Sequence, residues 1–295
     1  MGNKTGLRLG ATALSLEGVL GGLKLEDGAV LLDYPQLVRK TVENGFNHVE
    51  LSADLYYVLP ASFSRKNIEE WVSMKDKGVT FSVHLPIWSI ELDSPVEDIR
   101  AASVSAVVKP VTVLEDIKPL TYVLHVAGPL AAEVNRMEAN QEYKRLFFEV
   151  LASNASRSVE QIVSYMTDAG VESRRIALES IEFPFSKTLE IAERFDASIC
   201  IDTGHILAGY SGGLSIENAI KKCSERLGEI HLHDAYRRVE EGRLVVRDHL
   251  PLGAGDLNVE SFFKVLRETG FAGPIVFELG LNDARASLSR IASFL

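Results

Sequence analysis

The sequence predicts a single (β/α)₈ barrel domain that spans residues 1–295. Apolar runs typical of buried parallel strands alternate eight times with helical segments, and no all-α or all-β block interrupts the alternation. The length and the 46% hydrophobic content are sufficient for one large core. We therefore expect the functional groups at the carboxyl ends of the strands, where barrels of this class carry them.

Each expected strand is a short apolar run that ends at a polar residue or a turn. The sixth strand is the clearest example, because Ile199, Cys200 and Ile201 lead directly into Asp202. The eight strands are expected at 7–13, 47–52, 80–86, 122–126, 176–180, 198–202, 229–234 and 274–278.

Capping residues locate the helices between these strands. Asp33 and Pro35 predict a helix start, and Gly45 predicts its end. The run Ser94-Pro95-Val96-Glu97 predicts a capping box for a third helix. Further helices are expected at 66–77, 141–169, 187–195, 215–227, 259–269 and the C-terminal end, and the charged segment 236–248 is expected to be an excursion from the barrel.

Charge and cysteine content exclude several classes of partner. The net charge is -10 and no dense Lys/Arg run occurs, which argues against binding to a nucleic-acid backbone or to an anionic membrane. The two cysteines, Cys200 and Cys223, form no disulfide framework, and no apolar signal or spanning segment is evident. We therefore expect a cytoplasmic protein that acts on a small molecule.

Ionisable side chains recur at the ends of the expected strands. Imidazole and carboxylate together are the ligands of Zn²⁺, Mn²⁺, Co²⁺ or Fe²⁺, whereas Mg²⁺ favours oxygen alone. A lone strand histidine is more often a packed residue, so the prediction depends on their number at one rim. We expect two or more divalent ions at this rim, where the sequence offers Glu50, His84, His125, Glu179, Asp202, His205, His231, His233, His249 and Glu278.

Three residues near this set are expected to have other roles. His48 lies two residues before Glu50 and so at a different depth of the barrel. Cys200 alternates with Asp202 and is expected in a lower layer of the core. His231 is the preferred ligand of its strand, which places His233 behind the metal ligands or on the substrate.

This ordered set resembles the metal-ligand pattern of the endonuclease IV and xylose isomerase-like barrel superfamily over nearly the whole chain. The endonuclease IV branch of this superfamily has an acid two residues before the histidine that corresponds to His249, where this chain has Arg247. DNA repair also fits poorly with the negative charge. The endonuclease IV branch implies one metal on His84, His125 and Glu179, a second on Glu179, Asp202, His231 and Glu278, and a third on His205 and His249.

Within the superfamily the chain looks most like the cobamide-remodelling phosphodiesterases. The likeness is carried by the segments 81–86, 122–125, 178–185, 199–205, 230–233, 247–250 and 277–279, of which Glu-Ser-Ile-Glu-Phe-Pro-Phe at 179–185 is the least like a sugar isomerase. The resemblance implies hydrolysis of the nucleotide-loop phosphodiester, which separates a riboside from a corrinoid that keeps the phosphate.

The resemblance also assigns roles to individual residues. Glu179 would bridge two metals that activate a water, His205 or His249 would hold a phosphate oxygen, and Glu278 would complete the catalytic set. A flat corrinoid would need apolar walls and cationic donors. Candidates for these contacts are Trp88, Tyr56, Tyr57, His233 and Arg247, with Arg237 and Arg238 beside them.

Two alternatives remain open from the sequence. The first is a metal-dependent sugar or sugar-phosphate isomerase or epimerase, in which Glu179 and Glu278 shuttle a proton beside a polarised carbonyl. His84 and His125 argue against it, because a one-metal epimerase does not require them. The second is a non-catalytic binding barrel, which leaves the many ionisable groups at one rim unexplained.

Overall fold

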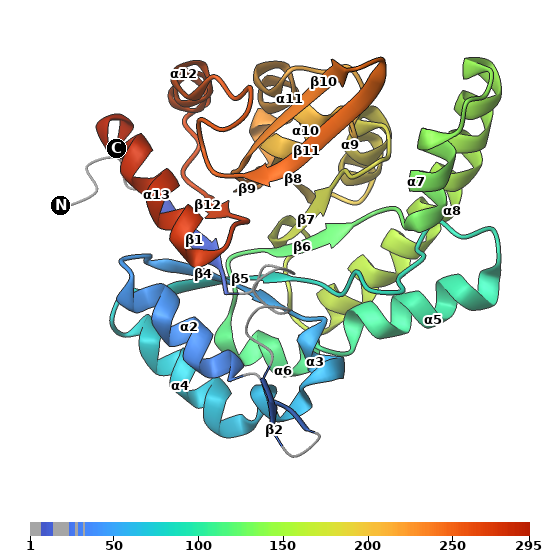
Figure 1. Ribbon diagram of the computed structural model, residues 1–295. Coiled ribbons are helices and arrows are strands. Elements are labelled where there is room, and N and C mark those ends of the chain that lie inside the picture. Colours follow the sequence, from blue (N-terminus) through green and yellow to red (C-terminus); the bar gives the residue numbers. More distant parts are fainter. Residues whose placement is uncertain (1–6, 14–23, 27–28, 32) are drawn as a thin grey trace.

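The fold was analysed in a computed structural model that describes residues 7–13, 24–26, 29–31 and 33–295. Eight parallel strands close into a barrel in the order β1-β12-β9-β8-β7-β6-β5-β4, with helices around the outside (Figure 1). Each strand therefore pairs with its neighbours in sequence, and β12 closes the barrel against β1. The predicted (β/α)₈ barrel is confirmed.

The barrel strands lie within two or three residues of the expected positions. They are β1 (Arg8–Thr12), β4 (His48–Ser52), β5 (Thr80–His84), β6 (Tyr122–His125), β7 (Ile176–Glu179), β8 (Ser198–Asp202), β9 (Leu227–His231) and β12 (Pro274–Phe277).

The outer layer is built from helices in the connections. The longer ones are α2 (Tyr34–Glu43), α4 (Arg65–Lys75), α5 (Glu97–Val108), α7 (Pro129–Arg136), α8 (Gln141–Asp168), α9 (Phe185–Arg194), α11 (Ile216–Lys222), α12 (Val259–Thr269) and α13 (Leu281–Ile291). Short helices α3 (Leu55–Val58), α6 (Val111–Leu114) and α10 (Thr203–Ala208) lie between them. No described helix combines the length and the apolar character needed to cross a membrane.

Local chemistry explains where the helices begin. Asp33 accepts a hydrogen bond from the Gln36 N–H and caps α2 as predicted. The capping box predicted at 94–97 is wrong, because α5 begins at Glu97 and Ser94 Oγ accepts from the Val96 N–H instead. In a capping box Ser94 would accept from the Glu97 N–H, so the observed bond reaches one residue less far along the chain, and the helix begins beyond it.

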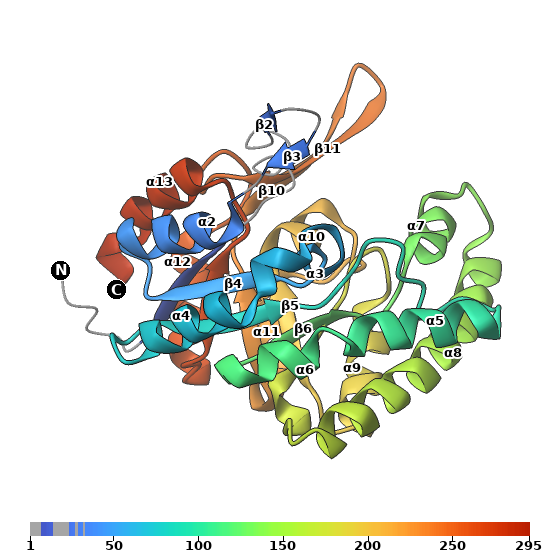
Figure 2. The same ribbon diagram turned by 90° about the horizontal axis from the view of Figure 1, so that it is seen from below.

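The segment expected as a charged excursion is an antiparallel hairpin of β10 (Asp234–Glu240) and β11 (Arg243–Leu250). Its turn is made by Glu241 and Gly242, whose φ values of 49° and 77° suit a type I′ turn. Figure 2 shows that this hairpin projects away from the barrel. A smaller hairpin joins β2 (Lys24–Glu26) to β3 (Ala29–Leu31).

The main core fills the space between the strands and the helices. Trp71 packs edge to face with Tyr34 and Phe63 there, at centroid distances of 6.1 and 5.8 Å, and these two rings lie tilted against each other at 5.8 Å. A smaller apolar group of Val123, Ala177 and Cys200 separates from this core. These side chains of β6, β7 and β8 point into the barrel and alternate with side chains that face the helices. The ends of the strands above them are therefore available for polar groups.

Candidate metal centre

Strand register places the predicted acids and histidines at one level. His125 pairs with Glu179 across β6 and β7, and Asp202 pairs with His231 across β8 and β9. Glu278 follows β12 directly. Because parallel strands in a barrel end at the same rim, these side chains converge from neighbouring strands.

His231 is the centre of the group. Its Nδ1 atom lies 3.4 Å from Glu179 Oε2, 3.2 Å from Glu278 Oε1 and 3.9 Å from Asp202 Oδ2. Its other nitrogen, Nε2, lies 3.1 Å from Glu50 Oε2. An acid at Nε2 favours the tautomer with its proton on that nitrogen, which would leave the Nδ1 lone pair to bind a cation among the three carboxylates.

Glu179 is surrounded by imidazoles on its other sides. Its Oε2 atom is 3.1 Å from His125 Nε2 and 3.7 Å from His84 Nε2, and its Oε1 atom is 3.1 Å from His205 Nδ1. The His84 ring is oriented by its Nδ1 atom, which lies 3.0 Å from the Leu85 carbonyl. Together with its contact to His231, Glu179 therefore lies within 4 Å of four imidazole rings.

Several of these buried atoms have close neighbours but no hydrogen bond. Glu179 Oε1, His205 Nδ1 and His231 Nδ1 are fully buried and lack a partner of acceptable geometry. An orphaned buried polar atom is costly unless something else satisfies it. Lone pairs that converge without mutual hydrogen bonds fit a divalent cation, and the mixed imidazole and carboxylate set suits Zn²⁺, Mn²⁺, Co²⁺ or Fe²⁺.

The charges in the cluster are strongly interdependent. Burial alone raises the pKa of Glu179, but His125 and His231 hold it well below its ordinary value. Burial likewise opposes protonation of His84, but Glu179 and Glu50 raise its pKa to about 10. The carboxylates therefore create a negative field that attracts cationic groups, and a divalent cation meets the same demand.

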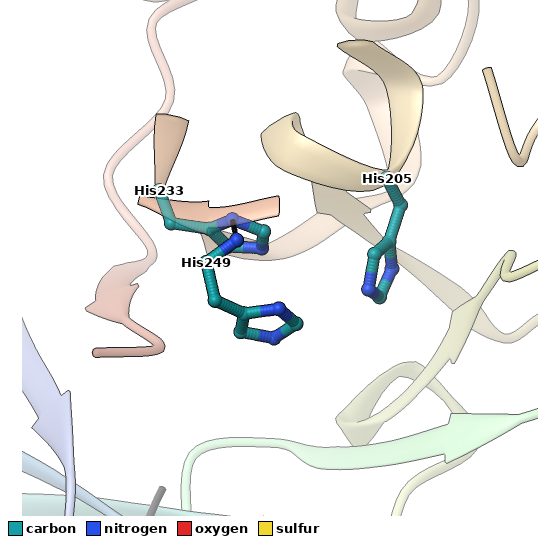
Figure 3. A group of neighbouring side chains, drawn as sticks. All are labelled: His205, His233 and His249. Atoms are coloured by element: carbon teal, nitrogen blue, oxygen red, sulfur yellow. Dashed lines mark hydrogen bonds between the residues drawn. The ribbon is translucent and has the colours of Figure 1, made fainter. Parts of the chain in front are cut away.

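A second group, of His205, His233 and His249, lies at the outer edge of the cluster (Figure 3). His233 accepts a hydrogen bond from the His249 N–H at Nδ1, and its Nε2 lies 2.9 Å from Asp202 Oδ2. Both of its ring nitrogens are therefore used. His233 orients Asp202, and its ring stacks on that of His249 with a centroid distance of 4.2 Å.

Glycine at position 204 is required by this arrangement. A Cβ atom on Gly204 would lie 2.0 Å from His233 Cε1. Thr203 also fixes the segment, because its hydroxyl donates to the His233 carbonyl and accepts from the His233 N–H. The Thr203-Gly204-His205 segment forms the start of α10, which the sequence did not predict.

The predicted substrate contacts are more scattered. Tyr57 donates its hydroxyl to the Ala106 carbonyl, and Tyr56 packs edge to face against it. Trp88 is 41% exposed on the segment after β5, and Arg247 is exposed on β11. These side chains are not drawn into the cluster around Glu179, and their contact with substrate stays a prediction.

Glu50 was expected only as one acid at the rim, and its pairing with His231 was not foreseen. Glu50 lies in the middle of β4 and is 1% exposed, and an acid inside an apolar strand is itself a sequence signal for a buried partner. Cys200 is buried, and burial raises its thiol pKa well above the ordinary value, so it lies beside the cluster as a neutral thiol. His48 is bonded to Thr80 and Ser82 hydroxyls, away from the convergent group.

The sequence matches the family described as xylose isomerase-like TIM barrel over residues 38–293. No curated protein matches. Solved structures share the fold: a D-tagatose 3-epimerase-like protein is 18% identical with a TM-score of 0.69, and the match covers 98% of this chain and 97% of that one. An L-ribulose 3-epimerase is 15% identical with a TM-score of 0.68, covering 98% and 94%. A 3-keto-D-glucoside 4-epimerase from E. coli is 14% identical with a TM-score of 0.66, covering 97% and 99%.

These comparisons correct the expected activity. The expectation of a cobamide phosphodiesterase, and with it of a hydrolase, is wrong, because the structural neighbours are sugar epimerases. The superfamily named from the sequence is correct. The segment Glu179 to Phe185 misled the prediction, because short motifs on one barrel superfamily do not determine which chemistry its rim performs.

Proposed function

The chain belongs to the xylose isomerase-like TIM barrel family, and from this premise we propose that it is a divalent-metal-dependent sugar isomerase or epimerase. The single observation that carries the proposal is the position of His231 Nδ1 within 4 Å of carboxylate oxygens on Glu179, Asp202 and Glu278. These four side chains come from four neighbouring strands and would hold one ion. When bound, such an ion polarises a substrate carbonyl and its adjacent hydroxyl.

Glu179 and Glu278 are the proposed proton carriers. In each, one oxygen faces His231, whereas the other faces away: Glu179 Oε1 lies by His205 Nδ1, and Glu278 Oε2 lies 3.6 Å from His249 Nε2. Although burial raises the pKa of the Glu278 carboxyl, His231 and His249 hold it well below its ordinary value, so it is ionised and able to accept a proton.

The proposed reaction needs these two carboxylates on opposite sides of the sugar. One removes a proton from the carbon next to the carbonyl, and the electron pair of the broken C–H bond moves to the carbonyl oxygen. The other returns a proton to the opposite face of the same carbon in an epimerase, and the electron pair returns from the oxygen to restore the carbonyl. In an isomerase the proton returns to the former carbonyl carbon, while the proton of the neighbouring hydroxyl moves to the former carbonyl oxygen, so that the carbonyl forms at the neighbouring carbon. His205 and His249 would bind substrate oxygens, since each lies beside one proton carrier.

His84 and His125 exceed the four-ligand set. In the proposed enzyme they hold Glu179 by contacts to its Oε2 atom, at 3.7 and 3.1 Å. They would orient the carboxylate and keep it ionised, which a proton carrier in a buried site requires. Metal content per chain, measured by elemental analysis, tests this assignment, and one ion is expected.

The test of the activity is solvent exchange. The protein loaded in turn with Mn²⁺, Co²⁺, Zn²⁺ or Fe²⁺ would be incubated in D₂O with a panel of ketoses, aldoses and their phosphates, and followed by NMR. We expect deuterium at the carbon next to the carbonyl and a new epimer or isomer. Glu179→Gln and Glu278→Gln should each abolish exchange, whereas Glu190→Gln, on the outside of α9, should not. If the metal-loaded protein catalyses deuterium exchange into none of the sugars of the panel, the proposal is overturned.

A further inference from the structure

A cavity of about 210 Å³, here called the α7 cavity, adjoins the metal-binding cluster. His125 lines it and also lies 3.1 Å from Glu179, so the cavity is next to the proposed reacting centre. Its other walls come from the segment after β5, from α7 and from the segment after β7. In Figure 1, α7 lies beyond the end of β6, beside α8.

The α7 cavity continues into a depression on the protein surface. A wider surface depression of about 590 Å³ shares Pro129, Ala132 and Arg136 with it and continues to Met137. Ligand pockets usually measure about 300 to 1,000 Å³, so the α7 cavity alone holds only part of a ligand. A molecule that reaches Glu179 through this cavity is therefore elongated and passes Arg136.

The walls of the α7 cavity are mostly apolar. The apolar side chains include Pro86, Ile87, Ile90, Ala132 and Ile181. A bare monosaccharide presents hydroxyl groups on every side, and each loses its water without a replacement against such walls. An apolar group gains from the same surface, so the lining favours a substituent rather than another sugar ring.

The walls are held in place before any ligand arrives. Asp54 Oδ1 accepts hydrogen bonds from the N–H groups of Ile87 and Trp88, at 3.0 and 2.9 Å. Asp93 Oδ1 accepts from the Gly128 N–H at 2.9 Å. Gly128 lets the opposite walls approach, because a Cβ atom there would lie 2.7 Å from the Ile90 carbonyl oxygen. A cavity fixed in this way loses little entropy when it binds.

One charged pair lies at the outer end. Arg136 donates to Glu182 Oε1, while Glu182 Oε2 is buried and has no hydrogen-bond partner. Glu182 is 4% exposed and its backbone is left-handed, with a φ of 48°, so its carboxylate is built into the cavity wall and holds the largely exposed Arg136 side chain there. A guanidinium held by a carboxylate presents a flat face on which an aromatic ring can stack.

We propose that the α7 cavity binds an apolar, preferentially aromatic, substituent of the sugar, so that the substrate is an aryl ether or aryl glycoside of a keto sugar. The inference depends on the proposed function, because it places the sugar itself between Glu179 and Glu278. The substituent lies against Ile87 and Ile90 and extends past Arg136.

The test compares a matched pair of substrates. A ketohexose and its 6-O-benzyl ether would be assayed with the metal-loaded protein by the same D₂O exchange. We expect kcat/KM to be at least tenfold higher for the benzyl ether, mainly through KM. Ile87→Gln and Ala132→Phe, which make the cavity polar or fill it, should reduce this preference to near unity. Ala139→Phe adds the same ring at an exposed position after α7 and should keep the preference.

Failure of this inference differs from failure of the proposed function. Exchange of both sugars with equal kcat/KM would overturn the inference and leave the isomerase or epimerase standing. Exchange of neither would overturn the proposed function. Calorimetry with the benzyl ether then decides the cavity: binding that Ala132→Phe removes and Ala139→Phe retains supports it, and no binding overturns it.

Discussion

His231 Nε2 lies 3.1 Å from Glu50 Oε2, while its Nδ1 atom faces the carboxylates of Glu179, Asp202 and Glu278. A buried acid behind the ring thus selects which nitrogen is free on the other side. The same principle holds for Asp202, whose Oδ2 atom is oriented by His233. Residues that touch no substrate therefore set the geometry of those that would hold the ion.

Removal of the Glu50 carboxylate is expected to weaken metal binding. Glu50→Ala frees the His231 ring to rotate and to change its tautomer, and we expect roughly 10- to 100-fold weaker affinity for Mn²⁺ or Co²⁺. Glu50→Gln keeps an acceptor for the His231 N–H and should lose less. Isothermal titration calorimetry of the three proteins checks this order, and equal affinity in all of them would contradict it.

A single methyl group at position 204 should have a similar effect. Gly204→Ala places a Cβ atom 2.0 Å from His233 Cε1, so the His233 ring must move away from Asp202. We expect metal affinity to fall about as far as in His233→Ala, on the order of tenfold. Gly213→Ala, which meets no atom within 4 Å, is the matched control. Unchanged affinity in Gly204→Ala would show that His233 does not position Asp202.

The barrel was predictable because its strands are covered on both faces. Such strands appear in sequence as unbroken apolar runs, of which Ile199 to Ile201 is typical, and the side chains are all buried as expected. The hairpin β10–β11 was missed for the opposite reason. Charges such as Arg237 and Arg238 occupy consecutive positions, which hides the alternation of a strand, and its turn has Glu241 where Asn or Asp is usual.

The candidate site was predictable in composition but not in geometry. Residue types at strand ends identified the acids and histidines, since every strand ends at the same rim. The pairing of Glu50 with His231 depends on barrel closure, because these residues are 181 positions apart and on different strands. The six-residue helix α10 is too short to show a helical period, so the orientation of His205 had no sequence signal.

Metal removal should lower thermal stability. A ligand at 100 times its Kd stabilises the folded state by about 2.7 kcal/mol, and for a domain of 295 residues that corresponds to a Tm shift of roughly 4 to 5 °C. Differential scanning calorimetry with and without a chelator measures the shift. Glu179→Gln removes the carboxylate that contacts four imidazoles of the cluster, and its Tm should respond little to the chelator, whereas Glu190→Gln should respond like the wild type.

The buried acid Glu229, on the strand below His231, should make stability depend on pH. Burial, with the nearby charge of Glu50, raises the pKa of Glu229 to about 8, and its oxygens are bonded by the hydroxyls of Ser82 and Thr121. The folded protein therefore keeps a proton that the unfolded chain releases near its ordinary pKa of 4.5. As pH rises from about 4.5 to about 8, the unfolded state binds fewer protons than the folded state, and the free energy of unfolding falls.

Glu229→Gln isolates this contribution, because the amide has a similar shape, hydrogen-bonds to both hydroxyls and does not titrate. The quantity to follow is the free energy of unfolding of the variant minus that of the wild type. We expect this difference to become more positive by roughly 2 to 5 kcal/mol between pH 5 and pH 8. Urea unfolding at several pH values gives this difference, with Glu190→Gln as the exposed control. Parallel pH profiles for wild type and Glu229→Gln would mean that Glu229 is already ionised in the folded protein.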